Sequence, residues 1–195
     1  MRATAASPLT VGATAPSRTQ MTTPPVAALA IVLALACLLI TAGVSKMFRP
    51  SRAAASIDAY ALLPAGYGRR LWFSVAALEI AIGVALLLPD LRALAAVASA
   101  ALFGGYALLI ARAVWRGESD FDCGCVGGAA GLRPSYPLVV RNLVLSCAAL
   151  AMLHASTSDP SREDWLFAAA IALLFLAVNS IVGGLIARRQ WPTDD

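Results

Sequence analysis

The fold follows first from the stretch Val26-Ala-Ala-Leu-Ala-Ile-Val-Leu-Ala-Leu-Ala-Cys-Leu-Leu-Ile-Thr-Ala-Gly-Val-Ser45, which contains no charged side chain. A helix needs about 20 apolar residues to cross a bilayer, and this run has that length. Four further runs of the same kind follow along the chain: 71–88, 93–114, 138–155 and 165–187. Continuous apolar runs are wrong for barrel strands, which alternate. The sequence therefore predicts an all-α, polytopic membrane helix bundle with a fifth, C-terminal span.

Composition agrees with a chain that lies mostly in lipid. Hydrophobic residues make up 59% of the 195 residues and charged residues 13%. A soluble domain would carry roughly twice that charged fraction. The net charge of +4 comes from basic clusters near the ends of the runs. Such charge sets orientation in the bilayer and does not indicate a nucleic-acid partner. We expect a multi-pass protein of the plasma membrane.

The runs divide the chain into four parts. Residues 1–25 are rich in Ala, Thr, Ser and Pro and are predicted to be a disordered tail. Residues 26–155 form a four-helix membrane domain, with a long loop at 115–137. Residues 156–187 hold a short loop and the fifth span, and 188–195 form a C-terminal tail.

Shorter features predict how the helices pack and connect. Ser51 can cap a short interfacial helix that places Ile57, Tyr60 and Ala61 on one face. Small residues at four-residue spacing predict close contacts between helices. These pairs are Ala100 with Gly104 and Gly183 with Ala187.

The loop Phe121-Asp-Cys-Gly-Cys-Val-Gly-Gly128 carries the clearest chemical signal. A disulfide between Cys123 and Cys125 would close a small strained ring, and such bonds exchange readily. The pair is therefore a candidate catalytic dithiol. A purely structural disulfide or two thiolates of a metal site are the alternatives. A zinc site needs more ligands, and the single histidine, His154, lies toward the opposite side of the membrane, so we expect no metal.

Alternation of the spans places several candidate residues on one side of the membrane. We call side A the side on which the first span ends. Lys46, the loop with Cys123 and Cys125, and Arg141 at the start of the fourth span all belong to side A. Glu79 lies in the second span, roughly 12 Å below that side at 1.5 Å per residue.

Glu79, Arg141 and Lys46 are possible supporting residues for the dithiol. An ionisable group in hydrocarbon is costly, so Glu79 either relays a proton, pairs with a cation or is protonated and hydrogen-bonded between helices. Arg141 can pair with Glu79, contact a thiolate or quinone oxygen, or snorkel to the surface. Lys46 has similar options, or marks the end of its span.

Three polar or thiol residues inside the spans have simpler explanations. Cys37 and Cys147 are either packing residues or an electron relay to the loop. Asn179 is expected to form an interhelical hydrogen bond.

Several short motifs together resemble the methylamine utilisation protein MauE, within the wider DoxX-like group of small membrane proteins. The matching motifs are Gly43-Val-Ser-Lys46, Leu62-Leu-Pro64, Leu78-Glu79 with Gly83 and Leu87, Cys123-Gly-Cys125-Val-Gly127 and Val140-Arg-Asn-Leu143. The likeness covers roughly residues 26–155. It implies a MauE/DoxX-like four-helix core, to which the fifth span is an addition.

The resemblance also implies a function. MauE-like proteins are implicated in maturing or exporting the disulfide-rich small subunit of methylamine dehydrogenase. This chain would then be a membrane thiol-disulfide oxidoreductase or maturation factor, with Cys123 and Cys125 as its redox pair. A thioredoxin-like protein or a disulfide-containing exported protein would be its partner, and quinone a possible electron acceptor. The alternatives are a non-catalytic anchor or subunit of a membrane complex, or a small proton-coupled transporter using Glu79.

Charge and chemistry disagree about orientation. Most basic residues near or beyond the ends of the spans fall on side A, namely Lys46, Arg49, Arg52, Arg69, Arg70, Arg112, Arg116, Arg133, Arg188 and Arg189. The positive-inside rule then assigns side A to the cytoplasm. Disulfide formation belongs on the outer side, where oxidants prevail. Both orientations stay open from the sequence, and the family resemblance favours the outside.

Overall fold

The computed structural model describes residues 25–48, 67–118, 132–154 and 161–190, together with Ser51, Ala55, Asp58, Tyr60, Phe121 and Cys123. The predicted N-terminal tail, up to residue 24, lies outside the described residues, as do Ile57 and Ala61 of the predicted interfacial helix. Within that predicted helix, Ser51, Ala55 and Asp58 have helical backbone.

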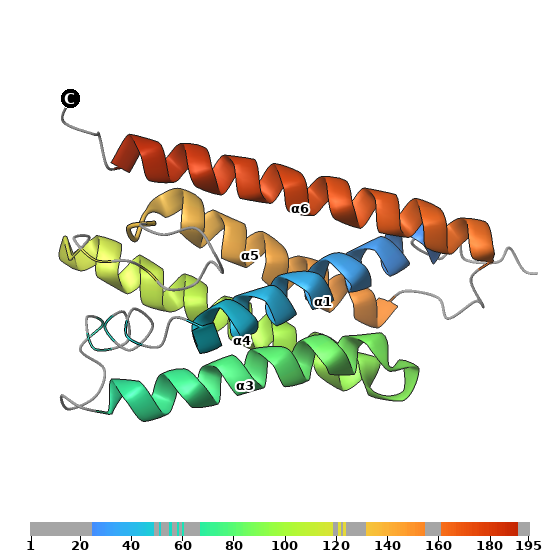
Figure 1. Cartoon of the computed structure of the whole chain (residues 1–195), viewed down its shortest axis with the longest axis horizontal. Coiled ribbons are helices and arrows are strands. Elements are labelled where there is room, and N and C mark those ends of the chain that lie inside the picture. Colours follow the sequence, from blue (N-terminus) through green and yellow to red (C-terminus); the bar gives the residue numbers. More distant parts are fainter. Residues whose placement is uncertain are drawn as a thin grey trace, which may run out of the picture.

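Five long helices make up the described part of the chain (Figure 1). They are α1 (Pro25–Phe48), α3 (Gly68–Leu87), α4 (Arg92–Arg116), α5 (Tyr136–Ala151) and α6 (Arg162–Gln190). Short 3-10 turns, η1 (Pro89–Leu91) and η2 (Met152–His154), precede α4 and follow α5. All five long helices have the length and apolar composition needed to cross a membrane. The predicted all-α bundle with a fifth C-terminal span is confirmed.

Local signals at the helix ends explain where several of the helices begin or end. Ser161 caps α6, because its hydroxyl accepts the N–H of Asp164 at 3.2 Å while the Asp164 carboxylate accepts the Ser161 N–H at 2.8 Å. α4 ends at Gly117, which has φ +72° and donates its N–H to the Val114 carbonyl. Pro89 follows α3 and prevents its continuation.

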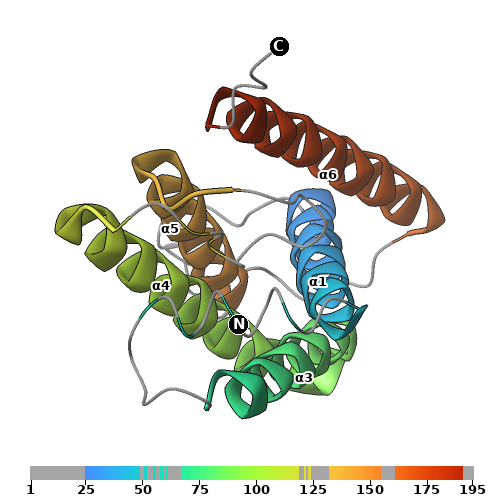
Figure 2. The ribbon, with the colours of Figure 1, turned by 60° about the vertical axis from the view of Figure 1, so that its left-hand side comes forward.

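α1 is the central helix of the bundle. It packs along α3 on one side and along α6 on the other, while α4 packs along α5 (Figures 1 and 2). α1 is also the most buried of the spans, and α6 the least. α6 is therefore a peripheral helix held mainly by α1.

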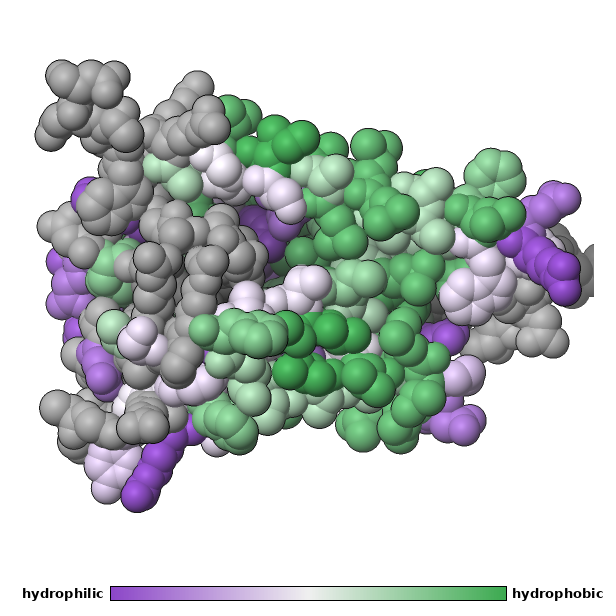
Figure 3. All heavy atoms as spheres, in the orientation of Figure 1, coloured by the Kyte–Doolittle hydropathy of each residue, from purple (hydrophilic) through white to green (hydrophobic). Residues whose placement is uncertain are grey.

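The described residues form three clusters of apolar side chains, and the two largest are layers of the bundle interior. The larger layer joins α1, α3, α4 and α5 and contains Leu35, Leu86, Phe103 and Leu145. The smaller layer contains Ile110, Cys123, Leu132 and Leu138. Figure 3 shows apolar residues over the middle of the molecule and polar residues toward its two ends, as a membrane-spanning bundle requires.

Candidate functional site

Glycine at position 43 sets the distance between α1 and α3. A methyl group placed there would lie 2.7 Å from the Ala76 carbonyl oxygen and 2.7 Å from the Ile80 side chain. Gly83 has the same function one level away, against Ile40 and the Ala36 carbonyl. The two helices therefore approach more closely than side chains would permit. Both glycines belong to the sequence motifs quoted above, but those motifs did not predict this contact.

The close approach brings Lys46, one turn after Gly43, against Glu79. The Lys46 Nζ lies 2.7 Å from each carboxylate oxygen of Glu79. The Glu79 side chain is 1% exposed and that of Lys46 11% exposed. Two opposite charges in this geometry largely cancel each other, and only as a pair are they tolerable at this depth.

Tyr106 of α4 completes the cluster. Its hydroxyl donates a hydrogen bond of 2.5 Å to Glu79 Oε1, and the Lys46 Nζ lies 5.7 Å from the centre of its ring. We call Lys46, Glu79 and Tyr106 the buried triad. Tyr106 was not among the residues predicted from the sequence. The available signal was a phenol inside an apolar span, on the same helix face as Phe103 and Ile110, since a buried hydroxyl needs a partner.

Arg141 does not pair with Glu79, so that predicted option is wrong. Its Nε donates a 2.8 Å hydrogen bond to Asn179 Oδ1 on α6. The expected interhelical hydrogen bond of Asn179 is thereby confirmed. Glu79 pairs with Lys46 because Gly43 places α1 directly against α3, whereas Arg141 faces α6.

Asn142 lies between the two apolar layers. On α5 it falls between Leu138, which belongs to the smaller layer, and Leu145, which belongs to the larger. It is fully buried, and its Nδ2 donates to the Leu138 carbonyl at 2.8 Å. Its Oδ1 is buried and has no hydrogen-bond partner among the described residues. On α4, Tyr106 also packs against both layers. Asn142 and the buried triad therefore lie at the same height in the bundle, between the two apolar layers.

Cys123 lies at the side-A end of the bundle. It is 3% exposed and packs with Ile110, Leu132 and Leu138. Its N–H donates to the Leu132 carbonyl at 2.8 Å, which fixes the backbone on that side. Cys125 lies outside the described residues.

Tyr60 makes a second contact with the backbone of Cys123. The Tyr60 hydroxyl donates to the Cys123 carbonyl at 3.4 Å. Its ring meets the edge of Phe121 with centroids 4.9 Å apart. Tyr60 comes from the predicted interfacial segment, so that segment contacts the cysteine loop.

Tyr106 connects the triad with the layer around Cys123. Its hydroxyl binds Glu79, while its ring packs against the smaller layer that contains Cys123. A carboxylate, an ammonium and a phenol therefore lie next to the layer that holds a cysteine. Such a set can accept and return protons while charge stays balanced inside the membrane.

The remaining cysteines are set apart from this site. Cys37 and Cys147 are both exposed on outward faces of α1 and α5, and neither belongs to the layer around Cys123. The described residues show no contact that would support an electron relay from Cys37 or Cys147 to the loop. Within the same described part of the chain, no three His, Cys, Asp or Glu side chains gather as metal ligands would.

Comparisons with known proteins place the chain in a family. The model of the family "Methylamine utilisation protein MauE" matches residues 24–155. The MauE of Paracoccus denitrificans is 34% identical over 163 residues, covering 81% of this chain and 88% of the relative. The MauE of Methylophilus methylotrophus is 33% identical over 175 residues, covering 84% and 90%. No solved structure matches. The chain therefore belongs to the MauE family, and it is a multi-pass membrane protein.

Proposed function

We propose that this protein is a membrane thiol-disulfide factor that helps a partner protein form its disulfides during methylamine utilisation. The observation that carries the proposal is the position of Cys123. Its backbone is held from two sides, and its side chain packs in a layer that Tyr106 joins to a buried Glu–Lys pair. The relatives' names supply the methylamine context.

The chemistry is an exchange of two thiols for one disulfide. A Cys123–Cys125 disulfide is attacked by a substrate thiolate, and the resulting mixed disulfide is resolved by the second substrate thiol. The substrate leaves oxidised, and both loop cysteines become thiols. Reoxidation of the loop pair removes two electrons and two protons, and a membrane quinone is the acceptor that we propose.

In this proposal the buried triad takes part in the transfer of the two protons that leave the loop thiols. The two thiol protons have to leave a site that is closed by apolar side chains. Tyr106 is the polar group of α4 that reaches from this layer to Glu79. Lys46 keeps the carboxylate compensated, so that a proton can be taken up and released without an isolated charge in lipid.

The same proposal specifies the class of partner protein and the side of the membrane that the loop faces. The partner is a thioredoxin-like protein or an exported, disulfide-containing protein. In the family's namesake system this is the small subunit of methylamine dehydrogenase. The loop then faces the oxidising side of the plasma membrane.

Complementation provides the test. A Paracoccus denitrificans strain lacking its MauE is supplied with this chain and grown on methylamine. We expect Cys123→Ser and Cys125→Ser to abolish growth while the protein still accumulates in the membrane. The matched control is Cys37→Ser with Cys147→Ser, whose thiols lie on outward faces and whose loss should leave growth unchanged. Normal growth of the Cys123→Ser/Cys125→Ser double variant would overturn the proposal and favour a non-catalytic subunit.

A further inference from the structure

Cys123 presents almost no surface to a protein that approaches the bundle from side A. It is 3% exposed. Its neighbours in the smaller apolar layer are Ile110, Leu132 and Leu138. They come from α4, from the residues just before α5 and from α5 itself, so the layer surrounds Cys123 with three parts of the chain. A second macromolecule cannot bring its own sulfur into contact with a side chain packed in this way.

The backbone of Cys123 is fixed at both of its polar groups. Its N–H donates to the Leu132 carbonyl at 2.8 Å, and its carbonyl accepts from the Tyr60 hydroxyl at 3.4 Å. The Tyr60 ring also meets the edge of Phe121, two residues before Cys123. Turning Cys123 outward would break these contacts, so the contacts hold its side chain in the layer.

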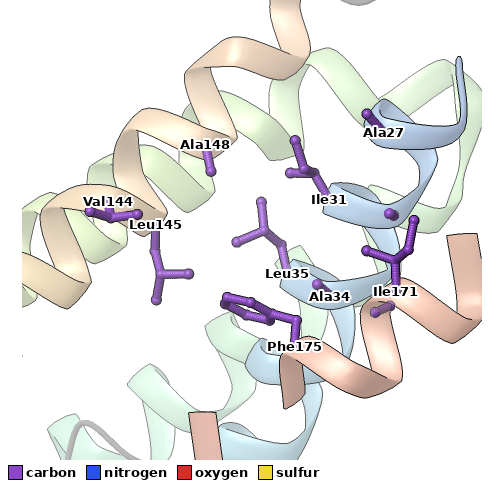
Figure 4. Close-up of a pocket in the computed structure, with 11 residues that line it drawn as sticks. Ala27, Ile31, Ala34, Leu35, Val144, Leu145, Ala148, Ile171 and Phe175 are labelled. Atoms are coloured by element: carbon purple, nitrogen blue, oxygen red, sulfur yellow. The ribbon is translucent and has the colours of Figure 1, made fainter. Parts of the chain in front are cut away.

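An apolar cleft between α5 and α6, with α1 as its floor, does not lead to Cys123 either (Figure 4). The cleft has a volume of about 290 Å³. Its lining includes Leu35 and Leu145 of the larger layer but no residue of the smaller layer. The cleft therefore enters the bundle at the larger layer, away from the sulfur.

Thiol-disulfide exchange requires access to one particular sulfur. The attacking thiolate approaches that sulfur in line with the S–S bond that breaks, and the other sulfur leaves with the electron pair. The apolar layer prevents a protein thiolate from approaching Cys123 Sγ in this way. The same layer does not prevent Cys123 from being the sulfur that leaves, because a leaving sulfur needs no contact with the substrate.

We propose that Cys123 is the inner sulfur of the loop pair, which never bonds to the substrate, and that every mixed disulfide forms through Cys125. The inference rests on the proposed thiol-disulfide function and gives the two sulfurs separate roles. The substrate thiolate bonds to Cys125 Sγ, the Cys123–Cys125 bond breaks, and Cys123 Sγ takes the electron pair.

Apolar surroundings disfavour a thiolate, so Cys123 takes up a proton that the triad carries in the proposed function. The second substrate thiolate then attacks the substrate sulfur of the mixed disulfide, and Cys125 leaves as a thiolate that is protonated in turn. The substrate has lost two electrons, and the loop pair has gained them.

A trapped adduct reports which sulfur is attacked. The probe is a reduced thioredoxin whose second active-site cysteine is replaced by serine, so that the probe cannot resolve the adduct. It is mixed with the oxidised Cys37→Ser/Cys147→Ser chain in phosphatidylcholine nanodiscs. The reaction is stopped with acid, and the released thiol is alkylated with N-ethylmaleimide in denaturant.

Fragmentation of the peptide that carries both loop cysteines then locates the two groups by mass spectrometry. We expect thioredoxin on Cys125 and N-ethylmaleimide on Cys123, in about ten-fold or greater excess over the reverse arrangement, since a small difference in barrier height gives that ratio of rates.

Single-cysteine variants of the same background provide the matched comparison. Cys123→Ser keeps only Cys125 and should react with a polyethylene glycol maleimide about ten times faster than Cys125→Ser, which keeps only Cys123. In SDS the two variants should react equally, because the layer that covers Cys123 is then unfolded.

Thioredoxin on Cys123, on both sulfurs equally or on neither would overturn the inference, the last because Cys125 would then be no more reachable than Cys123. Thioredoxin on Cys125, together with normal growth of the Cys123→Ser/Cys125→Ser variant on methylamine, would support the assignment of the sulfurs and reject the proposed thiol function in the cell.

Discussion

A carboxylate inside a membrane helix is stable only when its charge is balanced, and Glu79 has two partners. Lys46 supplies an opposite charge at 2.7 Å, and Tyr106 supplies a hydroxyl at 2.5 Å. The three side chains come from three different helices. Their contact therefore joins α1, α3 and α4, and in the proposed function the same three side chains carry protons. Stability and activity have to be measured separately to distinguish these roles.

Removing one charge of the pair leaves the other buried. We expect Lys46→Met and Glu79→Leu each to lower the free energy of unfolding by about 3–5 kcal/mol, since an uncompensated buried charge remains. The double variant Lys46→Met/Glu79→Leu should recover a large part of that loss. The measurement is unfolding of the purified protein in detergent micelles titrated with SDS.

Activity of the double variant then separates structure from chemistry. If the triad carries protons for thiol exchange, the refolded double variant should accumulate in the membrane and fail to support growth on methylamine. Tyr106→Phe, which keeps the ring and removes only the hydroxyl, should show a smaller loss of stability and the same defect. Growth at the unsubstituted rate in both variants would assign the triad a purely structural role.

At the scale of the helices, the contact between α1 and α3 decides which side chains meet. Gly43 faces a backbone carbonyl that cannot move aside, whereas the atom nearest Gly83 is the side chain of Ile40. Substitution at Gly43 should consequently be the more harmful. A side chain at Gly43 would push α1 away from α3, and the turn that carries Lys46 would then move away from Glu79.

Alanine is the sharpest probe of this contact. Replacing glycine by alanine inside a helix normally stabilises the helix by roughly 1 kcal/mol. Gly105 of α4 has open space around it, so Gly105→Ala should be neutral or stabilising. Gly43→Ala should destabilise by about 1–3 kcal/mol because of overpacking. Equal unfolding midpoints for the two variants in the SDS titration would show that α1 and α3 do not approach closely.

The other small residues noted in the sequence also lie at contacts between segments. The predicted contact at Ala100 and Gly104 is confirmed, since the Ser146 hydroxyl of α5 donates to the Ala100 carbonyl at 2.9 Å and lies close to Gly104. Gly183 faces Leu132, the residue whose carbonyl accepts the Cys123 N–H. Gly43 thus allows close packing beside the triad, whereas a side chain on Gly183 would make only an ordinary contact, 3.9 Å from Leu132.

Across the whole molecule, orientation in the membrane decides whether the proposed chemistry is possible. The basic residues of side A favour a cytoplasmic loop, and disulfide formation requires the opposite. Arg141 and Lys46 are tied to Asn179 and Glu79, so these cations have functions besides marking the cytoplasmic face. The proposed function places the loop outside.

Thiol labelling reports this orientation directly. Intact cells carrying the chain with Cys37→Ser and Cys147→Ser are treated with a reductant and then with a membrane-impermeant maleimide. Cys123 is nearly buried, so we expect the accessible thiol of the loop pair to be labelled in intact cells after reduction and no labelling without the reductant. Labelling that appears only after the cells are permeabilised would put the loop in the cytoplasm and exclude a role in oxidising exported proteins.

Hydropathy alone determined the number of spans, the helical form and the long polar loop with its cysteines. These features depend on local composition and on the cost of exposing backbone groups to lipid, so they can be seen without knowing which helices are neighbours. The sequence also singled out Glu79, Lys46 and Arg141, because a charge within or at the edge of a span is rare.

Only the tertiary structure decided how those residues are paired. Lys46 meets Glu79 because Gly43 lets α1 lie against α3, and Arg141 meets Asn179 because α6 lies across the cleft from α5. Tyr106 belongs to the site because helix packing brings its hydroxyl from a third helix to Glu79. Which helices adjoin, and how each is rotated, depends on packing between distant segments. No local pattern of residues contains that information.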